Sequence, residues 1–202
     1  HHLSHAASAY FCSPFDEAAL LTFDAVGEWT TTTMGIGRGA NLRITDEIQF
    51  PHSLGLLYST FTAFLGFEVN DGEYKVMGMA PYGEPRYVDQ VWETVRQNDD
   101  GSFQLDLNYF NFHRSSRVQY SGKFSKLFGP PRNAQVPFFT ERTGFPSYYG
   151  APPAQYKEVS AYNQRYADIA ASIQAVTEEL ILSMVRALHR QTNLNRLCLA
   201  GG

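Results

Sequence analysis

The sequence HHLSHAASAYF, residues 1–11, places three histidines within five positions and follows them with small, helix-tolerant residues. A helix over this segment puts His1 and His5 one turn apart on one face, at a separation where two imidazoles can share a metal ion. Residues 20–24, LLTFD, are typical of a buried strand that ends on a carboxylate, Asp24. These residues predict a site of two histidines and one carboxylate with open positions, which suits Fe(II) or Zn(II).

The histidines also have simpler interpretations. A remnant of a purification tag would be a longer unbroken histidine run and would not lead directly into an alanine-rich helix start. His2 falls on another face of the helix, so we expect it to cap or pack rather than to bind a metal. The residue after His1 is a histidine, so the His-Glu-x-x-His pattern of metalloproteases is absent and a protease is disfavoured.

The composition is that of an ordinary globular protein. The chain has 202 residues, of which 44% are hydrophobic and 18% charged, and its formal net charge is -4. This length allows one large or two small domains with a real core. The slight acidity argues against a nucleic-acid partner, whose binding surface would show clustered Lys and Arg. A loose basic stretch, explained equally well by a solvated loop, comprises Arg114, Arg117, Lys123, Lys126 and Arg132.

The cysteines and the chain ends suggest a cellular context. Cys12 and Cys198 lie far apart without CxxC spacing, which fits a reducing cytosol and gives no disulfide framework. The apolar runs are too short to span a bilayer and no signal peptide is visible, so we expect a cytoplasmic protein without a membrane partner. The chain does not begin with Met and ends on LCLAGG, residues 197–202, so we expect an internal fragment of a longer protein.

The apolar and turn residues predict a β-meander followed by helices and a proline-rich segment. Residues 24–28 are expected to form a tight turn in which Gly27 supplies backbone freedom. Residues 73–83 fit neither a helix nor a strand, because two glycines and a proline interrupt them. The expected strands are residues 18–24, 29–36, 40–50, 103–112 and 197–200, and the expected helices are residues 1–11, 53–65, 86–96, 121–128 and 156–192.

Two glycine-containing segments are candidates for anion binding. Asp24 and Gly27, followed by the hydroxyls of residues 30–33, can bring a carboxylate, backbone N–H groups and hydroxyls to a phosphate, although the D-x-x-G pattern is weak by itself. Lys75 can neutralise an anion, and the glycines that follow it let the backbone approach a ligand. A structural loop with a surface lysine is the simpler interpretation of residues 73–83.

Six motifs, taken in order, resemble those of a known family. The chain is similar to the carbamoyltransferase family that includes the nodulation, cephalosporin-pathway and tobramycin carbamoyltransferases. The resemblance covers nearly the whole chain and is poor only in the proline-rich residues 97–153. The motifs are HHLSHAASAYF (1–11), LLTFDAVGEWTTT (20–32), PHSLGLLYS (51–59), EYKVMGMAPYG (73–83), YADIAASIQAVTEE (166–179) and LCLAGG (197–202).

The resemblance implies an α/β fold, namely a Kae1-like domain of the actin-like ATPase (ASKHA, ribonuclease H-like) class that is incomplete at both ends. It assigns residues 1–50 to the metal-site helix and β-meander and residues 51–96 to helices and a nucleotide-cleft motif. Residues 97–153 form the proline-rich insert, and residues 154–202 form a long helix and the start of a glycine loop.

The resemblance also implies the site residues. In that family the helix histidines and the strand-end aspartate bind a metal, typically iron, which carries over to His1, His5 and Asp24. A further aspartate ligand is expected beyond Gly202. The implied nucleotide-binding residues are Gly27, Lys75, Gly78, Gly83, Gly201 and Gly202.

The implied activity is carbamoyl transfer. In family members, carbamoyl phosphate and ATP give carbamoyl adenylate in a YrdC-like domain, and the Kae1-like domain passes the carbamoyl group to a hydroxyl of a small-molecule, sugar or natural-product acceptor. The YrdC-like domain is expected elsewhere in the same longer chain, so the fragment alone is expected to be inactive. The alternative functions are a tRNA threonylcarbamoyl transferase and a non-catalytic nucleotide-binding regulatory module. The oligomeric state is open, and a homodimer is one possibility.

Overall fold

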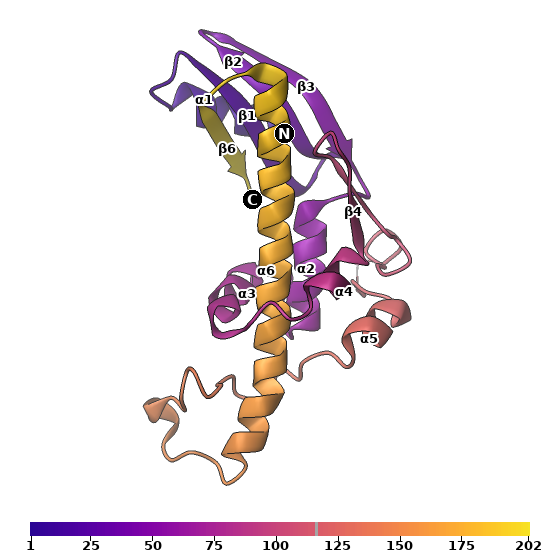
Figure 1. Cartoon of the computed structure of the whole chain (residues 1–202), viewed down its shortest axis with the longest axis vertical. Coiled ribbons are helices and arrows are strands. Elements are labelled where there is room, and N and C mark those ends of the chain that lie inside the picture. Colours follow the sequence, from indigo (N-terminus) through magenta and orange to yellow (C-terminus); the bar gives the residue numbers. More distant parts are fainter. Residues whose placement is uncertain (116) are drawn as a thin grey trace. The chain divides into compact units, whose positions relative to one another are not determined.

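The computed structural model describes residues 1–115 and 117–202, which divide into two compact units (Figure 1). Unit 1 consists of residues 1–57, 95–106 and 178–202, and unit 2 consists of residues 58–94 and 107–177. Two helices, α2 (Leu54–Phe64) and α6 (Tyr156–Thr192), contribute residues to both units.

Unit 1 is built on a four-stranded sheet in the order β3-β2-β1-β6. The first three strands form the predicted antiparallel meander, and β6 pairs with β1 in parallel, bringing the end of the chain beside its beginning. A separate two-stranded hairpin, β4 and β5, also belongs to this unit. The strands are β1 (Glu17–Gly27), β2 (Thr30–Arg38), β3 (Asn41–Gln49), β4 (Val95–Gln97), β5 (Phe103–Leu105) and β6 (Leu197–Gly201).

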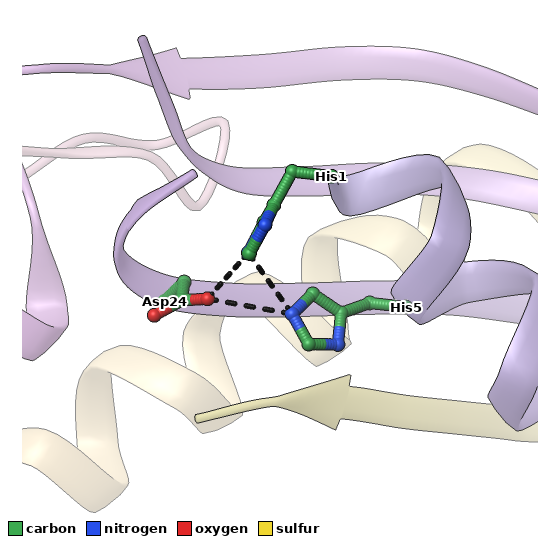
Figure 2. Close-up of side chains that lie close together, drawn as sticks. All are labelled: His1, His5 and Asp24. Atoms are coloured by element: carbon green, nitrogen blue, oxygen red, sulfur yellow. Dashed lines mark hydrogen bonds and ion pairs between the residues drawn. The ribbon is translucent and has the colours of Figure 1, made fainter. Parts of the chain in front are cut away.

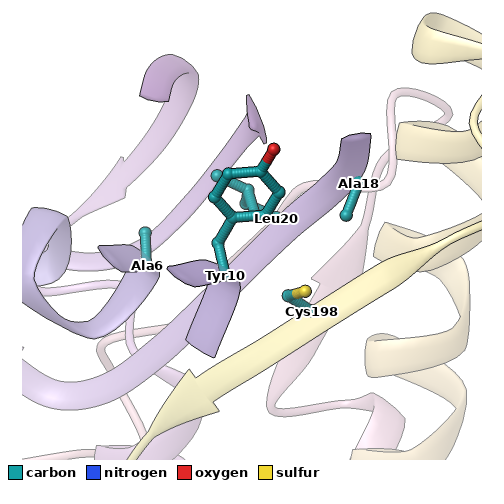
Figure 3. Packing of buried hydrophobic residues seen from close by; sticks show 5 residues of the cluster. All are labelled: Ala6, Tyr10, Ala18, Leu20 and Cys198. Carbon is teal, nitrogen blue, oxygen red and sulfur yellow. The ribbon is translucent and has the colours of Figure 1, made fainter. Parts of the chain in front are cut away.

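Helix α1 (His2–Phe11) packs on one face of this sheet (Figure 3). The contact is made mostly by small side chains, which let the helix approach the strands closely. Gly37 on β2 contributes to this approach, because a Cβ there would lie 2.7 Å from the Tyr10 ring. The buried cluster comprises Ala6, Tyr10, Ala18, Leu20 and Cys198.

The last turns of α6 lie against the opposite face of the sheet. Gln191 donates a hydrogen bond to Asp46 on β3 over 3.0 Å. Gly101, in the turn between β4 and β5, has a φ of +86° and lies against Ala187. A Cβ at Gly101 would be 2.6 Å from that of Ala187, so both the backbone conformation and the close approach favour glycine.

Unit 2 is helical and has an aromatic core. The centroid of the Phe61 ring lies 5.1 Å from the ring centroids of both Phe124 and Phe128, in the edge-to-face arrangement that aromatic pairs favour. Phe64 adds a further edge-to-face contact with Phe124 at 5.3 Å. Besides parts of α2 and α6, the unit contains α3 (Glu73–Met79), η1 (Ala80–Tyr82), α4 (Val88–Trp92), α5 (Gly122–Phe128) and η2 (Ser147–Tyr149).

The structure confirms the long helix 156–192 and corrects several shorter elements. Residues 73–79 form a helix rather than an irregular segment, because Gly78 is tolerated there and the proline falls in the first turn of η1. The predicted helix 86–96 shortens to α4 and is followed by β4, and the predicted strand 103–112 ends at Leu105. The predicted turn at 24–28 is also wrong, because β1 continues to Gly27.

Among the described residues, no helix combines the length and the apolar character that a membrane span requires.

Ser53 joins the start of α2 to β1. It is fully buried, its Oγ donates a hydrogen bond to the Ala25 carbonyl over 2.6 Å, and the same atom accepts one from the Leu56 N–H over 3.0 Å. The substitution Ser53→Ala is expected to lower the free energy of unfolding by about 1–2 kcal/mol, because the Ala25 carbonyl and the Leu56 N–H each lose a hydrogen bond. Urea denaturation measures this loss. Ser183→Ala, within α6, is the control and should change stability little.

His52 predicts a pH dependence of stability. Burial lowers the pKa of His52 below its ordinary value of 6.5, and its Nδ1 accepts a hydrogen bond from the Leu105 N–H over 3.1 Å. The folded state therefore takes up this proton less readily than the unfolded state, so its contribution to stability is lost as the pH falls from 6.5 toward the lowered pKa of the folded state. His52→Asn, whose amide oxygen can accept the same bond, should flatten this slope in urea titrations between pH 5 and 8. An unchanged slope would contradict the assignment.

Candidate metal centre

Two histidines one helical turn apart meet an aspartate from a separate strand at the N-terminal end of α1. Figure 2 shows His1 and His5 reaching from the helix toward Asp24 on β1. The His1 Nε2 atom lies 2.6 Å from Asp24 Oδ2 and 3.0 Å from His5 Nε2, and His5 Nε2 lies 3.3 Å from Asp24 Oδ2. A search of the described residues for three or more histidine, cysteine or acidic side chains that could share an ion finds this group.

The spacing of the donor atoms suits a metal ion. Ligand bonds of about 2.0–2.1 Å place neighbouring donors about 2.8–3.4 Å apart in right-angled or tetrahedral arrangements. The separations of 3.0 and 3.3 Å lie in this range, and the third, 2.6 Å, is somewhat shorter. The side chains of His1, His5 and Asp24 are 39%, 29% and 20% exposed, so one side of the cluster is open to further ligands. The residues present therefore fit Fe(II) or Zn(II).

The position of Asp24 results from an irregularity in β1. Regular pairing with β2 breaks between Phe23 and Gly27, and pairing with β6 ends at Phe23. Asp24 therefore lies just past the last regular pairs, although the strand itself continues. Its Oδ1 accepts a hydrogen bond from the Ala25 N–H over 2.7 Å, which leaves Oδ2 facing the histidines.

His2 turns away from the cluster, as its place on the helix predicts. It is 5% exposed, and its two ring nitrogens contact Thr22 Oγ1 at 2.8 Å and the Thr30 carbonyl oxygen at 2.9 Å. Thr22 in turn contacts Thr33 Oγ1 at 2.7 Å. Sequence reasoning missed this network, because cross-strand partners depend on register rather than on spacing along the chain.

The hydroxyls of residues 30–33 do not form the predicted phosphate cradle. Thr31, Thr32 and Thr33 are buried within the sheet. The Thr31 hydroxyl donates to the His52 carbonyl over 2.6 Å, and Thr30 donates to Glu47 over 2.9 Å. The hydroxyls of Thr30, Thr31 and Thr33 therefore bind other groups of the protein.

Three of the predicted nucleotide-binding glycines lie beside the cluster in unit 1. A Cβ at Gly27 would overlap the His1 ring and would be 2.8 Å from His2 Nε2. A Cβ at Gly201 would overlap the Phe23 carbonyl, and one at Gly202 would be 3.7 Å from Asp24 Oδ1. The hairpin and the end of β6 therefore form part of the surroundings of the candidate metal ligands.

The other three predicted residues belong to unit 2. Lys75 lies on α3, with Nζ 4.0 Å from Asp71 Oδ2, and Gly78 faces open space. Gly83 has a packing explanation, because a Cβ there would overlap the Ala167 carbonyl on α6. Its lack of a side chain thus allows close approach to a helix, where the sequence suggested approach to a ligand.

A row of polar side chains on α6 holds the backbone around Gly83. Gln164 donates to the Tyr82 carbonyl over 3.0 Å, and Asp168 accepts from the Glu84 N–H over 2.9 Å. Ser172 accepts from the Tyr87 N–H over 2.9 Å. Sequence reasoning missed this row. The signal that could have found it is the four-residue spacing of Gln164, Asp168 and Ser172 along one side of a long helix.

Unit 1 also has a hollow of about 570 Å³ that contains none of the three cluster residues. Its walls include Asp46 on β3, Asp100 in the β4–β5 turn and Arg190 on α6. Hydrogen bonds from the hydroxyl and N–H groups of Ser102 lower the pKa of Asp100 below its ordinary value. This hollow and the metal-ligand cluster are separate features of the unit.

Comparison with known proteins relates the chain to one family. The family profile described as Carbamoyltransferase N-terminus matches residues 1–202. An uncharacterized protein of Synechocystis sp. is 47% identical over the whole chain, which covers 29% of that protein. The nodulation protein NolO of Bradyrhizobium diazoefficiens is 31% identical and NolNO of Sinorhizobium fredii is 30% identical, again over the whole chain, which covers 30% and 25% of these proteins.

The chain thus spans less than a third of the length of these relatives. The match of the profile extends from the first to the last residue, and two relatives at or above 31% identity align with the complete chain. The chain belongs to the carbamoyltransferase N-terminus family.

Proposed function

We propose that this chain is the metal-binding part of a larger O-carbamoyltransferase. The observation that carries the proposal is the meeting of His1, His5 and Asp24, whose donor atoms come within 3.3 Å of one another from two separate elements. Membership of the carbamoyltransferase N-terminus family supports the same reaction class. The larger protein is inferred from the relatives, of which the chain covers 25–30%.

The reaction that we propose transfers a carbamoyl group to a hydroxyl of a small-molecule, sugar or natural-product acceptor. Carbamoyl phosphate is the donor, ATP activates it as carbamoyl adenylate, and a YrdC-like domain elsewhere in the same protein forms that intermediate. The fold that we propose for the complete domain is the Kae1-like, actin-like ATPase fold. Unit 1 combines a mixed parallel and antiparallel sheet with helices, which is compatible with this fold.

Each of the clustered residues has a role in this proposal. His1 and His5 bind the metal through Nε2, and Asp24 binds it through Oδ2 while the Ala25 N–H holds the other carboxylate oxygen. The bound Fe(II) or Zn(II) supplies a Lewis acid that polarises a carbonyl or phosphoryl oxygen. The exposed side of the cluster leaves room for a substrate oxygen.

The nucleotide is proposed to bind near glycine-rich backbone. Gly27 lies beside His1 and Gly202 beside Asp24, with Gly201 next to Phe23, and backbone without side chains lets phosphate groups come close to N–H donors. Within unit 2, a role in nucleotide binding is proposed separately for Lys75, Gly78 and Gly83. Support for these three comes from their place in the EYKVMGMAPYG motif and from the exposure of the Lys75 side chain, which is 40% exposed.

The metal centre predicts stoichiometric metal in the full-length protein. Reconstitution with Fe(II) under anaerobic conditions should give near-stoichiometric iron by elemental analysis, and His5→Ala should lose it, because one of three clustered donors is removed. His189→Ala, which removes a histidine that contacts the Leu194 carbonyl instead, should retain the metal. Equal metal content in both variants would rule out the proposed centre.

The activity should depend on the same carboxylate. Full-length protein supplied with radiolabelled carbamoyl phosphate, ATP and a panel of saccharide acceptors should label at least one acceptor. Asp24→Asn should lower kcat/KM by more than about 100-fold, because it removes a charged metal ligand. Asp46→Asn, in the separate hollow, makes the same chemical change and should leave the rate unaltered. No labelled acceptor, or full activity of Asp24→Asn, would contradict the proposal.

A further inference from the structure

His2 is the buried member of the histidine group. Its ring centroid lies 5.3 Å from that of His1 and 6.2 Å from that of His5, so His2 is a neighbour of both candidate ligands. Both of its ring nitrogens contact protein atoms, Thr22 Oγ1 and the Thr30 carbonyl oxygen. His2 therefore has no nitrogen left for a metal, and its role must be sought in these contacts.

The direction of each hydrogen bond in this network follows from the Thr30 carbonyl. A carbonyl oxygen only accepts, so the neutral His2 ring carries its proton on Nε2 and donates it there. Nδ1 is then an acceptor and takes the hydroxyl proton of Thr22. Thr22 has no second proton, so Thr33 donates to Thr22. The order of donors is Thr33, Thr22, His2 and finally the Thr30 carbonyl.

This chain of bonds ties the first turn of α1 to two strands. Thr22 belongs to β1, whereas Thr30 and Thr33 belong to β2, so the His2 ring joins both strands to the residue at which the helix begins. His1 precedes the helix as its N-cap residue, and helical backbone does not fix its conformation. The orientation of the His1 ring therefore depends on its neighbours.

Two of those neighbours are His2 and Gly27. The rings of His1 and His2 meet edge to face, with an interplanar angle of 75°. A Cβ at Gly27 would be 2.9 Å from His1 Cγ and 2.8 Å from His2 Nε2, so the backbone of the β1–β2 hairpin lies close to both rings. The His1 ring is thus in contact with the His2 ring and with this backbone.

We propose that His2 is a positioning residue of the metal centre, which holds His1 and His5 in ligand geometry without touching the ion. The inference rests on the proposed function, since it needs a metal at His1, His5 and Asp24. Partners that orient metal ligands strengthen binding because the ligands need less ordering when the ion arrives. An apolar ring at this position would fill the space but would leave the Thr22 hydroxyl and the Thr30 carbonyl without this partner.

The test measures metal affinity and ligand geometry in the full-length protein. Anaerobic titration with Co(II) gives a dissociation constant and a visible spectrum that reports the coordination geometry. His2→Phe should weaken binding by about 10- to 100-fold and alter the spectrum. His2→Gln, whose amide can donate to Thr30 and accept from Thr22, should recover most of the affinity.

A matched control separates positioning from simple loss of stability. The Tyr10 hydroxyl donates to the Asp16 carbonyl over 2.6 Å, at the end of α1 away from the cluster. Tyr10→Phe should lower the free energy of unfolding of the metal-free protein and leave the affinity and spectrum for Co(II) unchanged. Thr22→Val, which removes the hydroxyl bonded to His2, should weaken binding in the same direction as His2→Phe and provides the test if His2→Phe does not fold.

The outcomes distinguish this inference from the proposed function. If His5→Ala binds Co(II) as tightly as the unaltered protein, the metal centre itself is wrong. If His5→Ala loses the metal while Thr22→Val and a folded His2→Phe keep the original affinity and spectrum, only the role of His2 is wrong. Weaker binding in Tyr10→Phe to the same extent as in His2→Phe would also overturn the inference, because general loosening of α1 would then explain both.

Discussion

The contact between helix α1 and the sheet is the interaction on which unit 1 depends. The helix meets β1 and β6 through small side chains, and the Tyr10 ring lies against the bare backbone of Gly37. This close approach brings the first turn of the helix to the β1–β2 hairpin. Apolar packing along the same helix thus helps to place His1, His5 and Asp24, in keeping with functional sites built on rigid elements.

The first turn of α1 divides its polar side chains between two environments. His1 and His5 face solvent and the Asp24 carboxylate, whereas His2 enters the sheet and meets threonine hydroxyls. A buried imidazole is tolerated there because both nitrogens have partners. Threonine suits these strand positions, since its branched side chain favours strands and its hydroxyl can extend a hydrogen-bonded chain.

Glycines that look alike in the sequence serve different physical needs. Gly27 makes room for the imidazoles of the cluster, and Gly83 lets a loop approach the backbone of α6. Gly101 combines a positive φ with close contact to a helix. At Gly83, polar side chains on α6 also bind the neighbouring backbone. Asp168, for example, accepts a hydrogen bond from the Glu84 N–H and so stabilises the close approach that glycine allows.

The meander, the helix of residues 156–192 and the shared helix face of His1 and His5 could be predicted from the sequence, because they follow from local residue patterns and turn residues. It failed at residues 73–83 and 103–112, where short apolar runs with glycine or proline suit more than one structure. The sequence suggested Asp24 as a partner of the histidines, but the fold was needed to show that it meets them, that His2 joins two strands and that Gly83 packs on a helix. Those contacts join residues 19 or more positions apart. Strand register and helix packing determine them, and neither is visible in the spacing of residues along one chain.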